Sequence, residues 1–344
     1  MKLFRYCICV FVLVWATHFL SKTITISDSK LVLPLAMSII HEHNTDLDEY
    51  QSLFSPMRYS GTDWVDGHYY YYASIGTPLL ATPVLACISL VGKKVYYIKV
   101  FDIVKNGWSA GIELFIASLL VAITSVFVFL MAFELSFSLS VAILITFVFA
   151  FCTPAWSTAS RALWSHTGSI LMLSISLFAL LKAKRNTMWL FIAALALAYS
   201  YVSRPTNSLP VVFFTLYVMI SYPKQIWVYG LGMLVIFIPF LAYNYHIYHH
   251  LLSPYYQPTT LHVGATTTLW QGFTGTLFSP SRGLLIFTPV VIFSVAGVIM
   301  LIRVKKFTLL DGAIVLIIIA HTYVISSITT PFAVGVLDQG ISPI

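Results

Sequence analysis

The first acidic side chains of the sequence stand close to an apolar segment, where they could act on a molecule held at a membrane surface. Asp28 comes shortly after an apolar run that ends at Leu20, and Asp48 and Glu49 follow in the stretch Asp46-Leu47-Asp48-Glu49-Tyr50. A carboxylate beside a hydroxyl or amine can accept its proton during group transfer. We therefore take Asp28, Asp48 and Glu49 as candidate catalytic residues. The simpler interpretation is a helix cap at Asp28 and a solvated turn at the later pair.

Three solitary arginines, Arg161, Arg204 and Arg282, stand at the edges of later apolar segments. A guanidinium keeps its charge and places two N–H groups on the oxygens of one phosphate, so arginines at a membrane rim suit a lipid phosphate. His166 follows Arg161 by five residues, at the start of an apolar segment, and favours a shared polar site. We take these four residues as candidates for substrate binding. Snorkelling or helix capping explains each arginine alone equally well.

The composition is that of a membrane protein. Of the 344 residues, 59% are hydrophobic and only 9% are charged, and the mean hydropathy is +0.88. A domain that faces water needs about a quarter of its residues charged. The four cysteines lie in apolar runs without C-x-x-C spacing, which is typical of buried small side chains. These features exclude a cytosolic enzyme, a disordered chain and a disulfide scaffold.

The hydropathy pattern predicts an all-α polytopic membrane protein, with residues 1–344 forming a single membrane domain. About ten hydrophobic segments are expected, at 6–20, 69–91, 114–133, 137–156, 167–181, 188–202, 209–221, 226–245, 284–302 and 309–326. Residues 21–68 form an acidic loop between the first two segments, with seven of the twelve acidic residues and three basic ones. Residues 31–40 of this loop are apolar but too few to span, so we expect a short helix along the membrane surface.

Clusters of lysine and arginine predict the orientation, because cytoplasmic loops carry an excess of these residues. We expect the N-terminus, the lysines from Lys93 to Lys105 and the cluster that starts at Lys182 to be cytoplasmic, and the acidic loop to be non-cytoplasmic. Three apolar segments, an odd number, separate Lys105 from Lys182. Either a segment around Cys152 to Trp156 is re-entrant or one cluster is assigned to the wrong side. The net charge of +7 has this topological explanation, and no nucleic-acid partner is expected.

With these residues in view, the chain resembles the GT-C superfamily of membrane glycosyltransferases, of the protein-mannosyltransferase and aminoarabinose-transferase kind. The resemblance lies in the order of short motifs over roughly residues 20–290: a first helix, an acidic loop with Asp28, then LDEY at 47–50 and YYASIGTPLL at 71–80. Later motifs are LWSH at 163–166, RPT at 204–206 and LFSPSRGL at 277–284. Similar proteins usually carry an aromatic, glycine-rich loop and further spans where this sequence reaches Ile344, so a C-terminally truncated or inactive member of the family is an open alternative.

The resemblance implies a hexosyl- or pentosyltransferase that moves a sugar from a polyprenyl-phosphate donor to an unidentified acceptor on the non-cytoplasmic face. In that scheme Asp28 acts as a base or a metal ligand, while Arg204 and Arg282 hold the leaving phosphate. No cofactor is certain, and a divalent metal is compatible with the scheme. The expected partners are membrane lipid and the lipid-linked donor.

Two other classes remain open: a transporter or flippase for a lipid or solute, and a truncated noncatalytic membrane subunit. Transporters tend to bury charges near mid-span and often contain inverted repeats. Here Glu113, Glu134 and Asp311 stand near segment ends, and no repeat is visible. The sequence therefore favours chemistry at the membrane surface. The expected location is the cell membrane, the inner one if bacterial, with a cytoplasmic N-terminus.

Overall fold

The computed structural model describes residues 2–21, 23, 29–51, 61–93, 100–105, 109–257, 269–280 and 283–328. The chain divides into two compact units, which are described separately. The first comprises residues 1–207 and 227–255, and the second comprises residues 208–226 and 256–344. The single membrane domain stays a prediction.

Helices of spanning length make this a multi-pass helical membrane protein. Five helices in the described ranges are long and apolar enough to cross a bilayer. They are α1 (Lys2–Leu20), α6 (Ala110–Ser136), α8 (Ser165–Ala183), α11 (Ile226–Tyr248) and α15 (Leu309–Ile328). The other expected segments correspond to shorter apolar helices, so ten spans are not established. These are α4 (Gly76–Val91), α7 (Leu139–Phe151), α9 (Trp189–Ser203), α10 (Ser208–Ser221) and α14 (Val291–Arg303).

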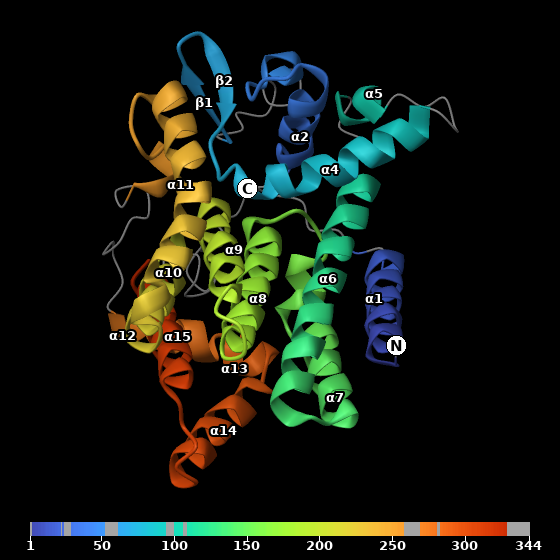
Figure 1. Cartoon of the computed structure of the whole chain (residues 1–344). Helices are drawn as coiled ribbons and strands as arrows, with labels where there is room; N and C mark the ends of the chain where they lie inside the picture. The colour runs from blue at the N-terminus through green and yellow to red at the C-terminus, as the bar shows by residue number, and fades with distance from the viewer. Residues whose placement is uncertain are drawn as a thin grey trace, which may run out of the picture. The chain divides into compact units, whose positions relative to one another are not determined.

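The helices of the first unit alternate in direction, as Figure 1 shows. At one end, the end of α1 meets the turn before α8, because Arg161 donates to the backbone carbonyl of His18. The beginning of α6 meets the same turn, where Glu113 accepts from the Leu163 amide at 2.8 Å. At the opposite end, Glu134 of α6 accepts from Lys182 at 2.6 Å. We call these the loop end, where residues 29–51 lie, and the far end.

Helix α4 does not continue the expected apolar segment 69–91 as a span. The segment starts as strand, and α4 begins only at Gly76, whose backbone lies so close to α9 that an added Cβ would be 2.6 Å from the Ser203 Cα. A Cβ on Gly168 of α8 would likewise meet Leu80 of α4 at 2.9 Å. In Figure 1 α4 runs crosswise over the loop ends of α8 and α9. The glycines permit this crossing because they let two backbones approach closely.

This course of α4 corrects the expected side of one basic cluster. Helix α5 (Val100–Lys105) packs against α2 and α4 at the loop end. Lys105, and Lys93 at the end of α4, therefore lie at the opposite end of the bundle from Lys182, whereas the sequence predicted one shared side. Lys94 and Lys99 lie outside the described residues. Three passages between Lys105 and Lys182 then follow naturally, because α6, α7 with its extension, and α8 each run the length of the bundle once.

The extension of α7 replaces the re-entrant segment considered for residues 152–156. Helix α7 ends at Phe151, and after Pro154 the chain forms one π-helical turn, η4 (Ala155–Ala159). Proline cannot continue the hydrogen bonding of α7, which explains the break. The turn continues toward the loop end, where Arg161 also donates to the Ser21 carbonyl at 3.3 Å.

The first loop is more structured than its composition suggested. Helix α2 (Val32–His41) matches the expected short apolar helix, but its residues from Val32 to Ser38 are buried against protein rather than laid on a surface. A hairpin follows, with β1 (Thr62–Val65) antiparallel to β2 (His68–Tyr71). Its turn is Asp66-Gly67, with φ of 49° and 91°. Asp-Gly is the favoured pair for a two-residue hairpin turn, in which both residues need positive φ.

The second unit contains α10, α12 (Leu269–Phe278), α13 (Leu284–Phe287), α14 and α15, with α15 packed against α10 and α12. The expected segment 284–302 is divided at Pro289, between α13 and α14. An apolar cavity of about 740 Å³ lies between α12 and α15, lined by residues such as Trp270 and Tyr323.

Candidate functional site

A cavity of about 860 Å³ opens beneath the first loop, within the first unit. This volume is in the range of pockets that hold small organic ligands. Its walls come from α2 and the loop after it, from the hairpin, and from α4, α9 and α11. The lining residues are Ile39, His43, Asn44, Thr45, Asp46, Tyr70, Ile75, Leu79, Tyr199, Val202, Ile236, Pro239, Phe240, Tyr243, His246 and Ile247.

The cavity changes from apolar to polar along α11. Ile236, Phe240, Tyr243 and His246 line it at intervals of three or four residues, so they occupy one face of the helix. Ile236 and Phe240 are apolar, whereas Tyr243 and His246, nearer the loop end, carry polar atoms. The Tyr243 hydroxyl forms a hydrogen bond with Thr45 of the first loop. The site is therefore amphipathic, with its polar end under the loop.

Close helix packing positions this wall. An added Cβ on Gly232 of α11 would lie 2.6 Å from the Phe191 carbonyl oxygen of α9, so only glycine fits this contact. On the other side, the Tyr199 hydroxyl donates to the Gly76 carbonyl at 2.8 Å and joins α9 to the start of α4. Ser74 donates to the Ser203 carbonyl in the same region. These contacts hold three walls of the cavity together.

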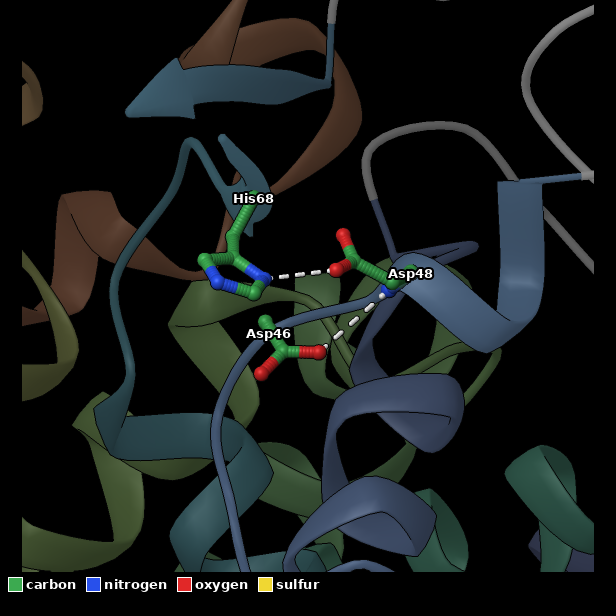
Figure 2. A group of neighbouring side chains, drawn as sticks. All are labelled: Asp46, Asp48 and His68. Carbon is green, nitrogen blue, oxygen red and sulfur yellow. Dashed lines mark hydrogen bonds and ion pairs between the residues drawn. The ribbon is translucent and has the colours of Figure 1, made fainter. Parts of the chain in front are cut away.

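Two carboxylates and one imidazole meet at the polar end, as Figure 2 shows. The Asp48 side chain accepts from the Tyr69 amide at 2.9 Å and pairs with Nδ1 of His68 at 2.7 Å. Asp46 bridges to Tyr70 through its backbone, and its carboxylate has only a long contact, 3.5 Å, with the Asp48 amide. Among the described residues, the Asp46 carboxylate therefore has this single long hydrogen bond, while the Asp48 carboxylate is bound to the hairpin.

The same three side chains offer a possible set of cation ligands. One ligand atom from each of Asp46, Asp48 and His68 lies within 4.8 Å of the others, and all three are partly or fully exposed. Carboxylate oxygens and an imidazole nitrogen suit divalent cations such as Zn²⁺ or Mn²⁺. In the structure, Asp48 and His68 instead hydrogen-bond to each other. A divalent metal stays a prediction.

Protonation of the loop carboxylates is shifted by burial. Burial raises the pKa of Glu49, and the neighbouring Asp46 and Glu42 charges add to this, against a hydrogen bond from Ser38 that lowers it. Burial also raises the pKa of Asp63 on β1. The pKa of His68 is raised by its hydrogen bond to Asp48. Glu49, predicted as catalytic, is half-buried and is not among the residues that line the cavity.

The Arg161 side chain is buried and bound to backbone carbonyls of neighbouring elements. It is 1% exposed, its Nε donates to the Trp156 carbonyl at 2.7 Å, and its Nη1 donates to His18 and Ser21. The guanidinium also lies over the Trp156 ring, 4.5 Å from the centroid. The His18 and Ser21 carbonyls are at or just beyond the C-terminal end of α1, where helix carbonyls carry partial negative charge. The side chain therefore joins helices rather than facing the cavity.

His166 and Arg204 lie at the loop end as well. The His166 ring stacks on Trp164, with centroids 6.0 Å apart, and no hydrogen bond or ring contact in the described part of the chain joins it to Arg161. Arg204 follows the last residue of α9, is partly exposed, and donates from Nε to Thr206 at 2.9 Å. Its charge also interacts with Tyr255. Arg204 is thus near the cavity residue Val202 without lining the cavity.

Asp28 and Arg282, the other two predicted site residues, lie outside the described residues. Asp48, Glu49, Arg161, His166 and Arg204 all lie at the loop end.

Sequence reasoning missed Asp46, His68, Tyr70 and the polar face of α11. The signal for the hairpin was present in Asp66-Gly67 between two short runs rich in aromatic residues. The approach of α11 to the first loop left no local signal, because these residues are almost 200 positions apart in the sequence.

Comparisons with known proteins leave the family open. No family model, no curated protein and no solved structure matches this sequence.

Proposed function

We propose that the protein is a membrane glycosyltransferase that moves a sugar from a polyprenyl-phosphate donor to an acceptor at the loop end of the first unit. The observation that carries the proposal is the amphipathic cavity, whose lining combines an acidic residue, Asp46, with apolar side chains of α9 and α11. A lipid-linked substrate needs both environments in one site. We place the loop end on the non-cytoplasmic face and the N-terminus in the cytoplasm.

The transfer requires two groups from the protein: a base that takes the acceptor proton and a positive side chain that binds the donor phosphate. A hydroxyl or amine of the acceptor attacks the anomeric carbon of the donor sugar, and the bond from that carbon to the phosphate oxygen breaks. The acceptor proton passes to a carboxylate, and the polyprenyl phosphate leaves with the bonding electron pair. Positive side chains stabilise the negative charge that develops on the leaving phosphate.

Asp46 and Arg204 are the described residues best placed for these two roles. Asp46 belongs to the lining of the cavity, whereas the Asp48 carboxylate is held by His68 and Tyr69. Arg204 is partly exposed at the same end, where its Nε donates to the Thr206 hydroxyl. Asp48 then acts as a positioning residue, and Arg161 as a structural one.

The proposal is tested by mass spectrometry of lipids and glycans from cells with and without the protein. A glycosylated product should disappear without the protein and return with the wild-type chain. Asp46→Asn and Arg204→Ala should each restore less than about one tenth of it, because removal of an acid–base group or a transition-state donor typically costs 10²-fold or more. Lys184→Ala, an exposed charge at the far end, is the matched control and should restore it fully. An unchanged profile of sugar-bearing molecules in the deletion would overturn the proposal.

A further inference from the structure

The polar end of the cavity has an acidic side chain, and no lysine or arginine lies among its described lining residues. Asp46 is its one carboxylate among these residues. Asp63 on β1 adds little to this charge, because burial raises its pKa and favours the neutral carboxyl group. Two histidines, His43 and His246, also line the cavity.

Backbone dipoles reinforce this charge. The last turns of α9 and α11 line the cavity through Val202 and Ile247, and α2 reaches it through Ile39. Helix C-termini carry partial negative charge, so three of them favour a cation or a hydrogen-bond donor. Only α4 directs its N-terminus here, and Pro78 in its first turn lacks one of the N–H groups that would bind an anion.

From this charge pattern we propose that the cavity binds the acceptor of the transfer, an amphiphile whose head presents an amine and no phosphate. The proposal rests on the proposed function in calling this ligand the acceptor. The amine faces Asp46 under the first loop. An alkyl chain lies along Ile236 and Phe240, where the wall is apolar. The donor phosphate is held outside the cavity, on the side of Arg204.

The placement of the acceptor inside the cavity and of the donor phosphate outside it has a physical reason. A phosphate placed beside Asp46 and three helix C-termini would be repelled, whereas a protonated amine gains charge-assisted hydrogen bonds there. The ammonium group must pass one proton to Asp46 before its nitrogen can attack the sugar. Arg204, two residues beyond Val202, is close enough in sequence to serve a donor at the cavity rim. The two substrates are then separated by the charge of their head groups. Asp46 binds the amine of the acceptor, and Arg204 binds the phosphate of the donor.

Photo-crosslinking tests the ligand class. Purified full-length protein in phosphatidylcholine nanodiscs at pH 8 is titrated with two twelve-carbon probes that carry a diazirine in the tail, one an alkylamine and the other an alkyl phosphate. The amine should label peptides of α9 and α11 saturably, with a half-saturation concentration about tenfold lower than the phosphate. An equal or reversed preference, or labelling that does not saturate, would overturn the inference.

Substitutions of two acidic residues test which carboxylate causes the preference for the amine probe. Asp46→Asn should reduce the preference for the amine several-fold, and thermal unfolding should show that the variant remains folded. Asp66→Asn removes an exposed acid of the hairpin that pairs with His249 and does not line the cavity, so it should keep the wild-type preference. If both variants lose the preference for the amine equally, Asp46 is not its cause. An alkyl glucoside probe with the same tail separates charge from polarity, and should bind between the other two.

The binding result and the proposed function can fail separately. If the amine preference is found but no sugar-bearing product depends on the protein, the cavity assignment stands and the transferase proposal falls. If a product depends on the protein but the cavity prefers the phosphate probe, the acceptor assignment falls and the transferase proposal stands.

Discussion

Single residues at the loop end show why charge type alone does not identify a site. Arg161 and Arg204 look equivalent in the sequence, since each is an isolated arginine at the edge of an apolar segment. In the structure Arg161 is 1% exposed and bound to three backbone carbonyls, while Arg204 is partly exposed and donates a hydrogen bond to the Thr206 side chain. The distinction depends on residues 140 or more positions away, such as Ser21, which a local motif cannot reveal.

Arg161→Gln should therefore destabilise the fold rather than alter ligand selectivity. The substitution leaves carbonyls at the end of α1 and within η4 without their donors, and each buried unsatisfied group costs about 1–3 kcal/mol. We expect a total loss near 3 kcal/mol, seen as a lower midpoint of thermal unfolding in detergent. Arg204→Gln is the matched control and should change the midpoint little. A midpoint equal to the wild type in Arg161→Gln would contradict the structural role.

The hairpin should loosen as pH rises, because the pKa of His68 is raised in the folded protein by Asp48. A raised histidine pKa means that the protonated ring favours the folded hairpin. Its contribution is complete below the ordinary pKa near 6.5 and is lost as pH passes the raised value. Hydrogen exchange of β1 and β2 amides, corrected for intrinsic rates, should show less protection at pH 8.5 than at pH 6. Asp48→Asn should remove most of this difference, and a pH dependence unchanged in that variant would exclude the pair as its cause.

At the scale of elements, hydropathy predicted which segments form helices, but it did not predict the direction of every helix. The apolar runs that form α6, α8 and α11 predicted spans whose bounds lie close to the observed ones. The same measure predicted a span at 69–91, where the chain forms a strand and then the transverse helix α4. Hydropathy reports whether a segment avoids water, and burial against protein satisfies that requirement as fully as lipid does, as α2 also demonstrates.

Gly232 and Gly230 offer a matched test of the α9–α11 contact. Both lie in α11, but an added Cβ meets the Phe191 carbonyl oxygen at 2.6 Å on Gly232 and nothing within 4 Å on Gly230. Gly232→Ala should cost about 1–3 kcal/mol, as overpacking does, and should weaken binding of the amine probe because the cavity wall shifts. Gly230→Ala should be neutral or stabilising by up to about 1 kcal/mol. Thermal unfolding and probe binding of the two variants, compared side by side, decide the point; similar behaviour would contradict the contact.

At the scale of the molecule, the sequence predicted the class of protein and the grouping of the candidate residues, but not the site itself. Composition was sufficient to predict a helical membrane protein. The described candidates, such as Asp48 and Arg204, do share one end of the first unit. The cavity could not be predicted, because it forms where α2, the hairpin, α4, α9 and α11 meet, and these elements span over 200 positions.

The arrangement of the first unit predicts which positions share a side of the membrane. With the four native cysteines replaced, single cysteines at Asp66 and Lys105 should react with a membrane-impermeant maleimide from one side, and a cysteine at Arg185 from the other. The sequence pattern instead predicted Lys105 on the side of Arg185, so the two interpretations differ at one position. Labelling of Lys105→Cys together with Arg185→Cys would refute the crosswise course of α4.

The convergence of α2, α9 and α11 has a consequence for any effort to re-engineer the pocket. Peptide dipoles do not titrate and cannot be deleted by exchanging side chains, so their field persists at every pH and in every point variant. Each helix end contributes on the order of 0.3–1 kcal/mol. The Asp46→Asn protein should therefore retain a residual discrimination against anions, and inverting the selectivity would require new cations strong enough to outweigh the main chain itself.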